Sequence, residues 1–89
     1  MANFLVGYDK HEGEDYSELE QVLKAYGTWW HNLDSTWLIK SSATAVQVRD
    51  GLIRHLDAAD KLLVIDVSGD AAAWWGFDDS ASKWLKENL

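Results

Sequence analysis

The residues that could do chemistry gather directly after the first apolar segment of the sequence. Asp9 ends that segment, and His11, Glu12 and Asp15 follow within six positions. Carboxylate oxygens are the ligands that Mg²⁺ and Mn²⁺ prefer, and such a cation can activate water and neutralise a phosphate. One interpretation is therefore a divalent metal site in this cluster, with Asp9 as a ligand. The interpretation that we favour is a solvated loop in which Asp15 caps the next helix.

Three further residues could do chemistry, and each has a plainer explanation. His31 lies between aromatic residues, which favours a packed and hydrogen-bonded ring over a ligand or base. His55 falls near the end of a predicted helix, where it would meet the helix dipole. Asp66 lies within the last predicted strand; it could be catalytic, but a charge there is typical of an edge strand that must not pair further.

The absence of other motifs narrows the function. The sequence has no cysteine, which excludes disulfides, thiolate zinc sites and a cysteine nucleophile. It contains no phosphate-binding or dinucleotide-binding glycine motif, no serine-hydrolase elbow and no zinc-protease motif. Mg²⁺ or Mn²⁺ at Asp9 is the one cofactor that the residues suggest.

Tryptophan is unusually abundant, with six in 89 residues. Tryptophan rings could stack on bases, but base stacking normally accompanies a positive groove. Here fifteen acidic residues outnumber eight basic ones, and the net charge is −7. We therefore favour core and interface roles over nucleic-acid binding. The residues expected at an interface are Trp30, Trp37, Trp74 and Trp75.

The elements that must position these residues follow from hydrophobic periodicity. Residues 3–8 form an apolar run, and because both of its alternating faces are apolar we expect a central strand. Residues 16–26 have the spacing of an amphipathic helix that ends at Gly27. Residues 28–33 and 36–40 are predicted strands, joined by a tight turn at residues 34–35.

A second helix and a last strand follow this hairpin. Thr44 and Gln47 have the spacing of a capping box, and Val48, Leu52 and Leu56 form an apolar stripe behind them. Residues 62–67 form the last strong strand.

The order βαββαβ predicts an α+β fold of the ferredoxin-like type, with an antiparallel sheet in the order 4-1-3-2 and both helices on one face. Residues 1–89 are one domain with a core over residues 3–68, because a chain of this length supports a single small core. Residues 71–89 form a Trp-rich tail with a short helix, capped by Asp79 or Ser80 and docked through Trp84 and Leu85. The other sheet face would be bare and apolar, so the tail, a second copy, or both must cover it.

This topology also predicts neighbours for Asp9. If the carboxyl ends of the first and third strands lie together, Asp9 neighbours Lys40 and Ser41 and lies near residues 60–61. Asp34 would then lie at the opposite end of the sheet, where it could not share a metal with Asp9.

Several of these features together resemble a known family. They are a strand ending in Tyr8-Asp9, a helix closing at Gly27, a hairpin containing Ser35-Thr36-Trp37, and Asp60 leading into Leu62-Leu63-Val64-Ile65. Over residues 3–68 the sequence resembles the small ferredoxin-like proteins that include the CRISPR-adaptation endonuclease subunit and VapD-type toxins. The resemblance implies a metal-dependent phosphodiesterase, in which Asp9 from each of two subunits holds a divalent cation across a dimer axis.

The sequence departs from that family at two places. Residues 10–15 are mostly acidic where the family's nucleases carry basic residues, and the tail is expected to be helical where the family often has a further strand. We therefore expect a small acidic homodimer that acts as a binding or adaptor protein for a basic partner, in a defence or counter-defence setting. The alternative is a metal-dependent endoribonuclease that uses Asp9. The sequence shows neither a membrane span nor a secretion signal, so we expect a cytoplasmic protein.

Overall fold

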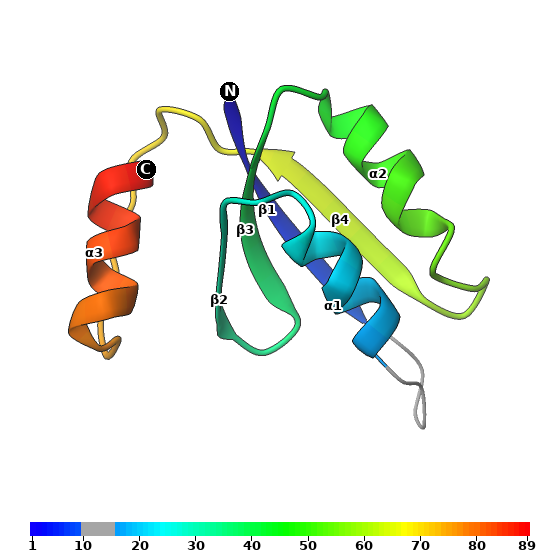
Figure 1. Ribbon diagram of the computed structural model, residues 1–89, viewed down its shortest axis with the longest axis horizontal. Helices are drawn as coiled ribbons and strands as arrows, with labels where there is room; N and C mark the ends of the chain where they lie inside the picture. The colour runs from blue at the N-terminus through cyan, green and yellow to red at the C-terminus, as the bar shows by residue number, and fades with distance from the viewer. Residues whose placement is uncertain (10–15) are drawn as a thin grey trace.

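The structure is a computed structural model that describes residues 1–9 and 16–89. Within these residues the order of elements is βαββαβ followed by one more helix (Figure 1), as the sequence predicts. The elements are β1 (Ala2–Asp9), α1 (Ser17–Lys24), β2 (Trp29–Leu33), β3 (Thr36–Ser41), α2 (Ala45–Ile53), β4 (Lys61–Asp66) and α3 (Asp79–Asn88).

The four strands form one antiparallel sheet in the order β2-β3-β1-β4. This is the predicted order read from the opposite edge, and β1 is central as its two apolar faces require. The architecture is α+β and is compatible with a ferredoxin-like fold. Two strands, β2 and β4, have a free edge within the described part of the chain.

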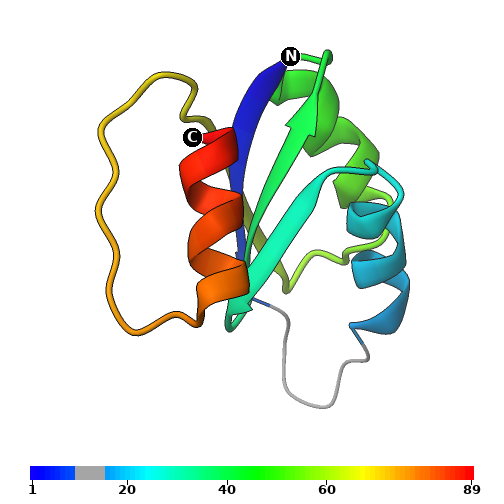
Figure 2. The same ribbon diagram turned by 60° about the vertical axis from the view of Figure 1, so that its left-hand side comes forward.

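One face of the sheet packs against α1 and α2 to form the main core (Figure 2). Alternate residues of β1 and β3 point to this face, and the helices contribute their apolar stripes. Burying each such side chain contributes roughly 1.5–3 kcal/mol. The buried members are Phe4, Val6, Tyr8, Leu19, Leu23, Trp37, Ile39, Val48 and Leu52.

Trp37 lies at the centre of this core and is completely buried. Its indole Nε1 donates a hydrogen bond to the Tyr8 hydroxyl at 3.1 Å, so its buried polar group is satisfied. The His31 ring stacks on Trp37 with 4.1 Å between ring centroids, and His31 Nδ1 lies 3.0 Å from the carbonyl oxygen of Thr36. His31 is therefore a packed and hydrogen-bonded residue, as its aromatic neighbours indicated.

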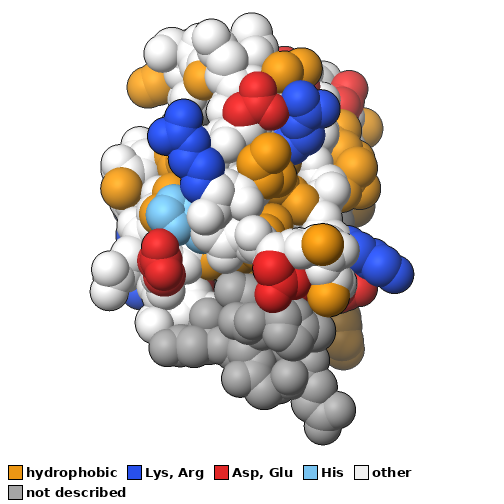
Figure 3. Space-filling model, turned by 90° about the vertical axis from the view of Figure 1, so that its right-hand side faces the viewer, with side chains coloured by type: hydrophobic (Ala, Val, Ile, Leu, Met, Phe, Trp, Pro, Cys, Tyr) orange, Lys and Arg blue, Asp and Glu red, His pale blue; other side chains and the backbone are white. Residues whose placement is uncertain are grey.

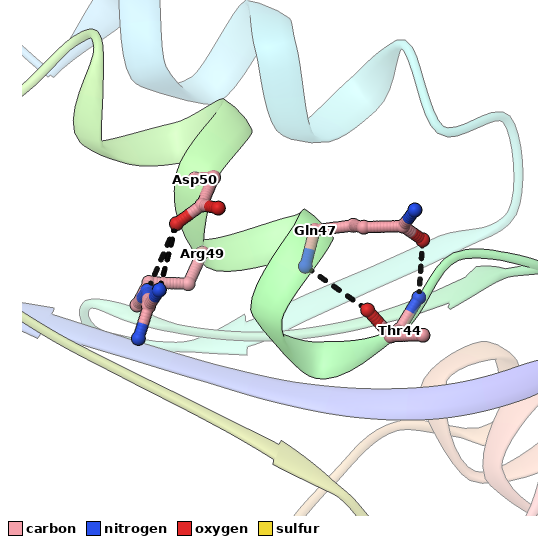
Figure 4. Close-up of polar contacts among 4 residues, drawn as sticks. All are labelled: Thr44, Gln47, Arg49 and Asp50. Carbon is pink, nitrogen blue, oxygen red and sulfur yellow. Dashed lines mark hydrogen bonds and ion pairs between the residues drawn. The ribbon is translucent and has the colours of Figure 1, made fainter.

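The second helix begins as predicted. The Thr44 hydroxyl accepts a hydrogen bond from the backbone N–H of Gln47, and the Gln47 side chain accepts one from the backbone N–H of Thr44 (Figure 4). This capping box satisfies donors that the first turn of a helix leaves free. On the next turn, Arg49 pairs with Asp50 at 2.9 Å.

The tail builds a second, smaller core on the other sheet face, where α3 lies across the sheet from α1 and α2 (Figures 1 and 2). Trp30 and Leu38 of the sheet pack against Ala81 and Leu85 of α3. The Trp30 Nε1 donates to the carbonyl of Ala81 at 3.2 Å, and the rings of Trp30 and Phe77 form a T-shaped contact with 4.9 Å between their centroids. The tail therefore belongs to the folded unit.

Both ends of α3 are fixed by side chains of amide or carboxylate type. Asp78 is the N-cap and accepts a hydrogen bond from the backbone N–H of Ala81 at 2.8 Å. The predicted cap at Asp79 or Ser80 is wrong, because the acceptor stands one residue earlier. At the other end the Asn3 side chain donates to the carbonyl of Asn88 at 2.6 Å, which ties α3 to β1. The predicted cap of the first helix, Asp15, lies outside the described residues.

We expect Leu85→Ala to destabilise the whole protein, because Leu85 is buried between α3 and the sheet. Large-to-small changes of this kind cost about 2–5 kcal/mol, which lowers the Tm of a domain this small by roughly 10 °C or more. Calorimetry of Leu85→Ala beside the exposed neighbour Lys86→Ala measures this. Equal melting of the two variants would mean that α3 is not part of the cooperative unit.

Tyr8 should make stability depend on alkaline pH, because burial raises the pKa of its hydroxyl above 10.0. The unfolded tyrosine ionises first as the pH rises through 10.0, so stability falls from there until the folded group also ionises. Tyr8→Phe should make this decline shallower. It should also cost roughly 1–3 kcal/mol at neutral pH, because the Trp37 Nε1 loses its acceptor.

The matched control for this experiment is Tyr26→Phe. Burial also raises the pKa of Tyr26, but the Tyr26 hydroxyl is not the acceptor of the Trp37 indole N–H. Urea unfolding from neutral pH to beyond pH 10 should therefore show a shallower decline for both variants and a neutral-pH loss for Tyr8→Phe alone. A Tyr8→Phe protein as stable as the wild type at neutral pH would contradict the assigned hydrogen bond.

Candidate functional site

Asp9 is exposed at the carboxyl end of β1, on the strand that the sequence predicted. Its direct partner across the β1–β4 ladder is Lys61. A lysine opposite an aspartate on a neighbouring strand pairs with its charge and opposes the approach of a further cation. The predicted proximity of Asp9 to Lys61 is confirmed, and it weakens the case for a metal at this position.

The other neighbours predicted for Asp9 are wrong. Lys40 and Ser41 lie opposite Asn3 and Ala2, at the far end of β1. Neighbouring strands in this sheet are antiparallel, so the end of β1 meets the start of β3 and not its end. The turn between β2 and β3 therefore lies at the same end of the sheet as Asp9, and the Tyr8 N–H donates to the Ser35 carbonyl at 3.1 Å.

Asp34 precedes Ser35 in that turn, so the expectation that Asp34 lies at the opposite end of the sheet is also wrong. No group of three or more histidine or acidic side chains suited to a metal occurs within residues 1–9 and 16–89. His11, Glu12 and Asp15, the remaining members of the predicted site, lie outside the described residues.

The other titratable candidates have structural contacts. His55 Nδ1 lies 2.6 Å from Glu18 Oε1, which links the end of α2 to the first turn of α1. Asp66 ends the edge strand β4, and its carboxylate accepts a hydrogen bond from the Ser68 N–H at 2.9 Å. Hydrogen bonds from Ser68 lower the pKa of Asp66. The sequence predicted an edge charge at Asp66 but not the contact between His55 and Glu18.

The four tryptophans expected at an interface have different environments. Trp37 and Trp30 are buried in the two cores, so neither presents a surface to a partner. Trp74 is half-buried against the second core. Trp75 points into solvent with 93% of its surface exposed. Of the four, Trp75 alone is freely available for contact with another molecule.

An apolar area that the sequence did not locate lies on the sheet beside the second core. Ile65 is 43% exposed and Leu63 is 57% exposed. They lie opposite Leu5 and Gly7 of β1, on the same face of the sheet as α3 but beyond the residues that α3 covers. A Cβ atom placed on Gly7 would meet no atom within 4 Å. The tail therefore covers β2, β3 and the first half of β1 on this face, and it leaves Gly7 and the adjoining residues of β4 uncovered. We call Gly7, Leu63 and Ile65 the open strip.

The open strip reaches the free edge of β4, and a groove follows that edge on its other side. The groove has a volume of about 220 Å³, and Val46 and Arg49 of α2 line it together with Leu62 and Val64 of β4. Figure 3 shows that hydrophobic side chains lie among charged side chains of both signs on the side formed by α1 and α2. This mixture differs from the basic surface that a nucleic-acid backbone requires.

Comparisons with known proteins add no relative from which a function could be inferred. No family model, no curated protein and no solved structure matches the chain. The resemblance to the CRISPR-adaptation subunit and VapD-type toxins therefore stays a prediction. Within the described ranges, no helix combines the length and the apolar character that a membrane crossing needs.

We predict that Asp9→Asn changes stability only slightly. The variant loses an attraction to Lys61 that is worth roughly 0.2–1 kcal/mol for a cross-strand pair of opposite charge. Millimolar Mg²⁺ or Mn²⁺ should leave the Tm of both proteins unchanged, because a ligand raises the Tm only when it binds the folded state. Calorimetry with and without metal measures both effects, and Asp50→Asn serves as a control for loss of an exposed carboxylate. A metal-dependent rise in Tm that Asp9→Asn abolishes would restore the metal site.

Proposed function

We propose that this protein is a homodimeric binding module rather than an enzyme, and that two copies join through the free edges of their β4 strands. The open strip and the unpaired edge of β4 carry this proposal. An exposed apolar edge strand is a template for pairing, and soluble proteins usually protect it with proline, a bulge or inward charges. The middle of β4, from Leu62 to Ile65, has none of these.

The sequence of β4 suits pairing with itself. A two-fold axis perpendicular to the sheet makes the strands antiparallel and keeps the same face of both sheets on one side. With Val64 on the axis, Leu63 lies opposite Ile65 of the second copy, and the two exposed residues of the open strip cover each other. The two four-stranded sheets then form one continuous sheet.

The charges at the two ends of β4 favour the same arrangement. Lys61 begins the strand and Asp66 ends it, and both are exposed. Antiparallel pairing brings the lysine end of one copy near the aspartate end of the other. Parallel pairing would set like charges side by side, which destabilises a sheet.

This dimer separates the two Asp9 side chains. Asp9 lies opposite Lys61, three residues along the strand from the proposed axis and one strand farther out. With about 3.4 Å per residue and about 4.8 Å between strands, the two Asp9 residues lie about 25 Å apart. Two carboxylates that share one cation must each approach it to roughly 2–2.6 Å. The proposed dimer and the shared metal site of an endoribonuclease therefore exclude each other.

The charge of the protein suggests the chemistry of a further partner. Each copy carries a net charge of −7, so a dimer would carry −14, from 2 × −7. A negatively charged surface attracts positively charged molecules and repels nucleic acid, which is also negative. We therefore propose a basic protein as the partner of the dimer. Exposed Trp75 would supply an aromatic contact in that complex.

The oligomeric state tests the proposal. At micromolar concentration, sedimentation should give a mass of about twice 10.1 kDa for the wild type. Ile65→Lys places a charge in the centre of the proposed contact and should give a monomer. Leu33→Lys is the matched control, because Leu33 is 49% exposed on β2, at the opposite edge of the sheet from β4, and this variant should stay dimeric.

Two results would contradict the proposed dimer. One is a wild type that sediments as a monomer, and the other is a dimer that Ile65→Lys leaves intact. A separate assay addresses catalysis: single-stranded RNA incubated with the protein and Mn²⁺ should remain whole. Cleavage that Asp9→Asn abolishes would replace the binding module with the endoribonuclease.

A further inference from the structure

An open pocket that side chains do not fill lies beside the second core. The pocket is half-open and has a volume of about 390 Å³. Leu5, Trp30 and Leu38 of the sheet form its floor, and Leu85 of α3 forms one wall. Residues 67–78, which connect β4 to α3, form the opposite wall and arch beside α3 in Figure 2.

The connecting segment keeps this space open through its composition. Three successive alanines, residues 71–73, line the pocket with the smallest side chains that carry a Cβ atom. Gly69 and Gly76 flank the alanines and have φ angles of +75° and +91°, a backbone conformation that other residues rarely adopt. The volume of about 390 Å³ lies within the range of roughly 300–1,000 Å³ that small-molecule pockets occupy.

The lining has a definite chemistry. It is mainly aliphatic and aromatic, and the rings of Trp30, Trp74 and Phe77 contribute to it. Thr36 and Asp70 are the two residues with polar side chains among those that line it. Within the described part of the chain the Asp70 carboxylate has neither a hydrogen bond nor an ion pair. An unpaired carboxylate beside an apolar pocket attracts a cation, and aromatic faces add to that attraction.

We propose that this pocket binds a small amphipathic amine, with its apolar body between the sheet and α3 and its ammonium group beside Asp70. A cavity of about 150 Å³ holds a benzene molecule. The larger volume here suits two fused rings or an alkyl chain of roughly ten carbons. A fatty acid of the same length would bring its carboxylate against Asp70. This inference does not depend on the proposed dimer, because no residue of β4 lines the pocket.

Titration with n-decylammonium and n-decanoate tests the proposal, since the two probes differ in the sign of the head group. Changes in the indole N–H signals of Trp30 and Trp74 report occupation of the pocket. Decylammonium should bind at least about ten times more tightly than decanoate. Asp70→Asn should remove this preference, and Asp50→Asn, a carboxylate on α2 across the sheet, should keep it.

A second variant tests the location of the site. Ala72→Leu enlarges a side chain that lines the pocket and should weaken decylammonium binding severalfold without unfolding the protein, which the dispersion of the NMR spectrum verifies. Equal affinity for both probes, or a preference that survives Asp70→Asn, would overturn the assignment of an amine. Undisturbed binding to Ala72→Leu, or no binding of either probe to the wild type, would overturn the site itself.

Discussion

The two central strands are apolar on both faces, and the rest of the molecule follows from the need to cover them. Residues of β1 and β3 alternate between the main core and the second core, so neither face can be left to water. Two helices bury the residues of β1 and β3 that point to the first face. A single short helix and its connecting segment must cover the second face, and their reach ends before β4. The open strip and the pocket are both products of this incomplete cover.

The elements could be predicted from the sequence because each depends on local chemistry. The stripe of Val48 and Leu52 and the capping box of Thr44 need no knowledge of distant residues. The strand order followed from the handedness of the two crossovers. The predicted neighbours of Asp9 are wrong because the order of the strands does not by itself give their directions. In an antiparallel pair the end of one strand meets the start of its neighbour, which brings Asp9 to the β2–β3 turn.

The features that carry the proposals could not be predicted in this way. The exposure of Leu63 and Ile65 depends on where α3 comes to rest, and that position depends on Trp30, Asn3 and the length of the connection. The N-cap of α3 could not be predicted for the same reason. Asp78, Asp79 and Ser80 are all residue types that cap helices, and the packing of α3 decides that Asp78 is the cap. The three successive alanines at residues 71–73 are small side chains that leave space beside them. The sequence alone does not show that this space lies over the sheet, so it does not predict a pocket.

The hydrogen bond between Asn3 and Asn88 has a consequence for how the protein folds. It joins residues 85 positions apart, and β1 also pairs with β4, so the contacts that complete the structure are strongly non-local. Chains rich in such contacts fold slowly, because long loops must close before their contacts form. During synthesis, β1 must wait for β4 to emerge, and Trp30 and Leu38 stay uncovered until α3 follows. The same apolar surfaces that invite a partner in the finished protein are thus a hazard for aggregation in the unfinished one.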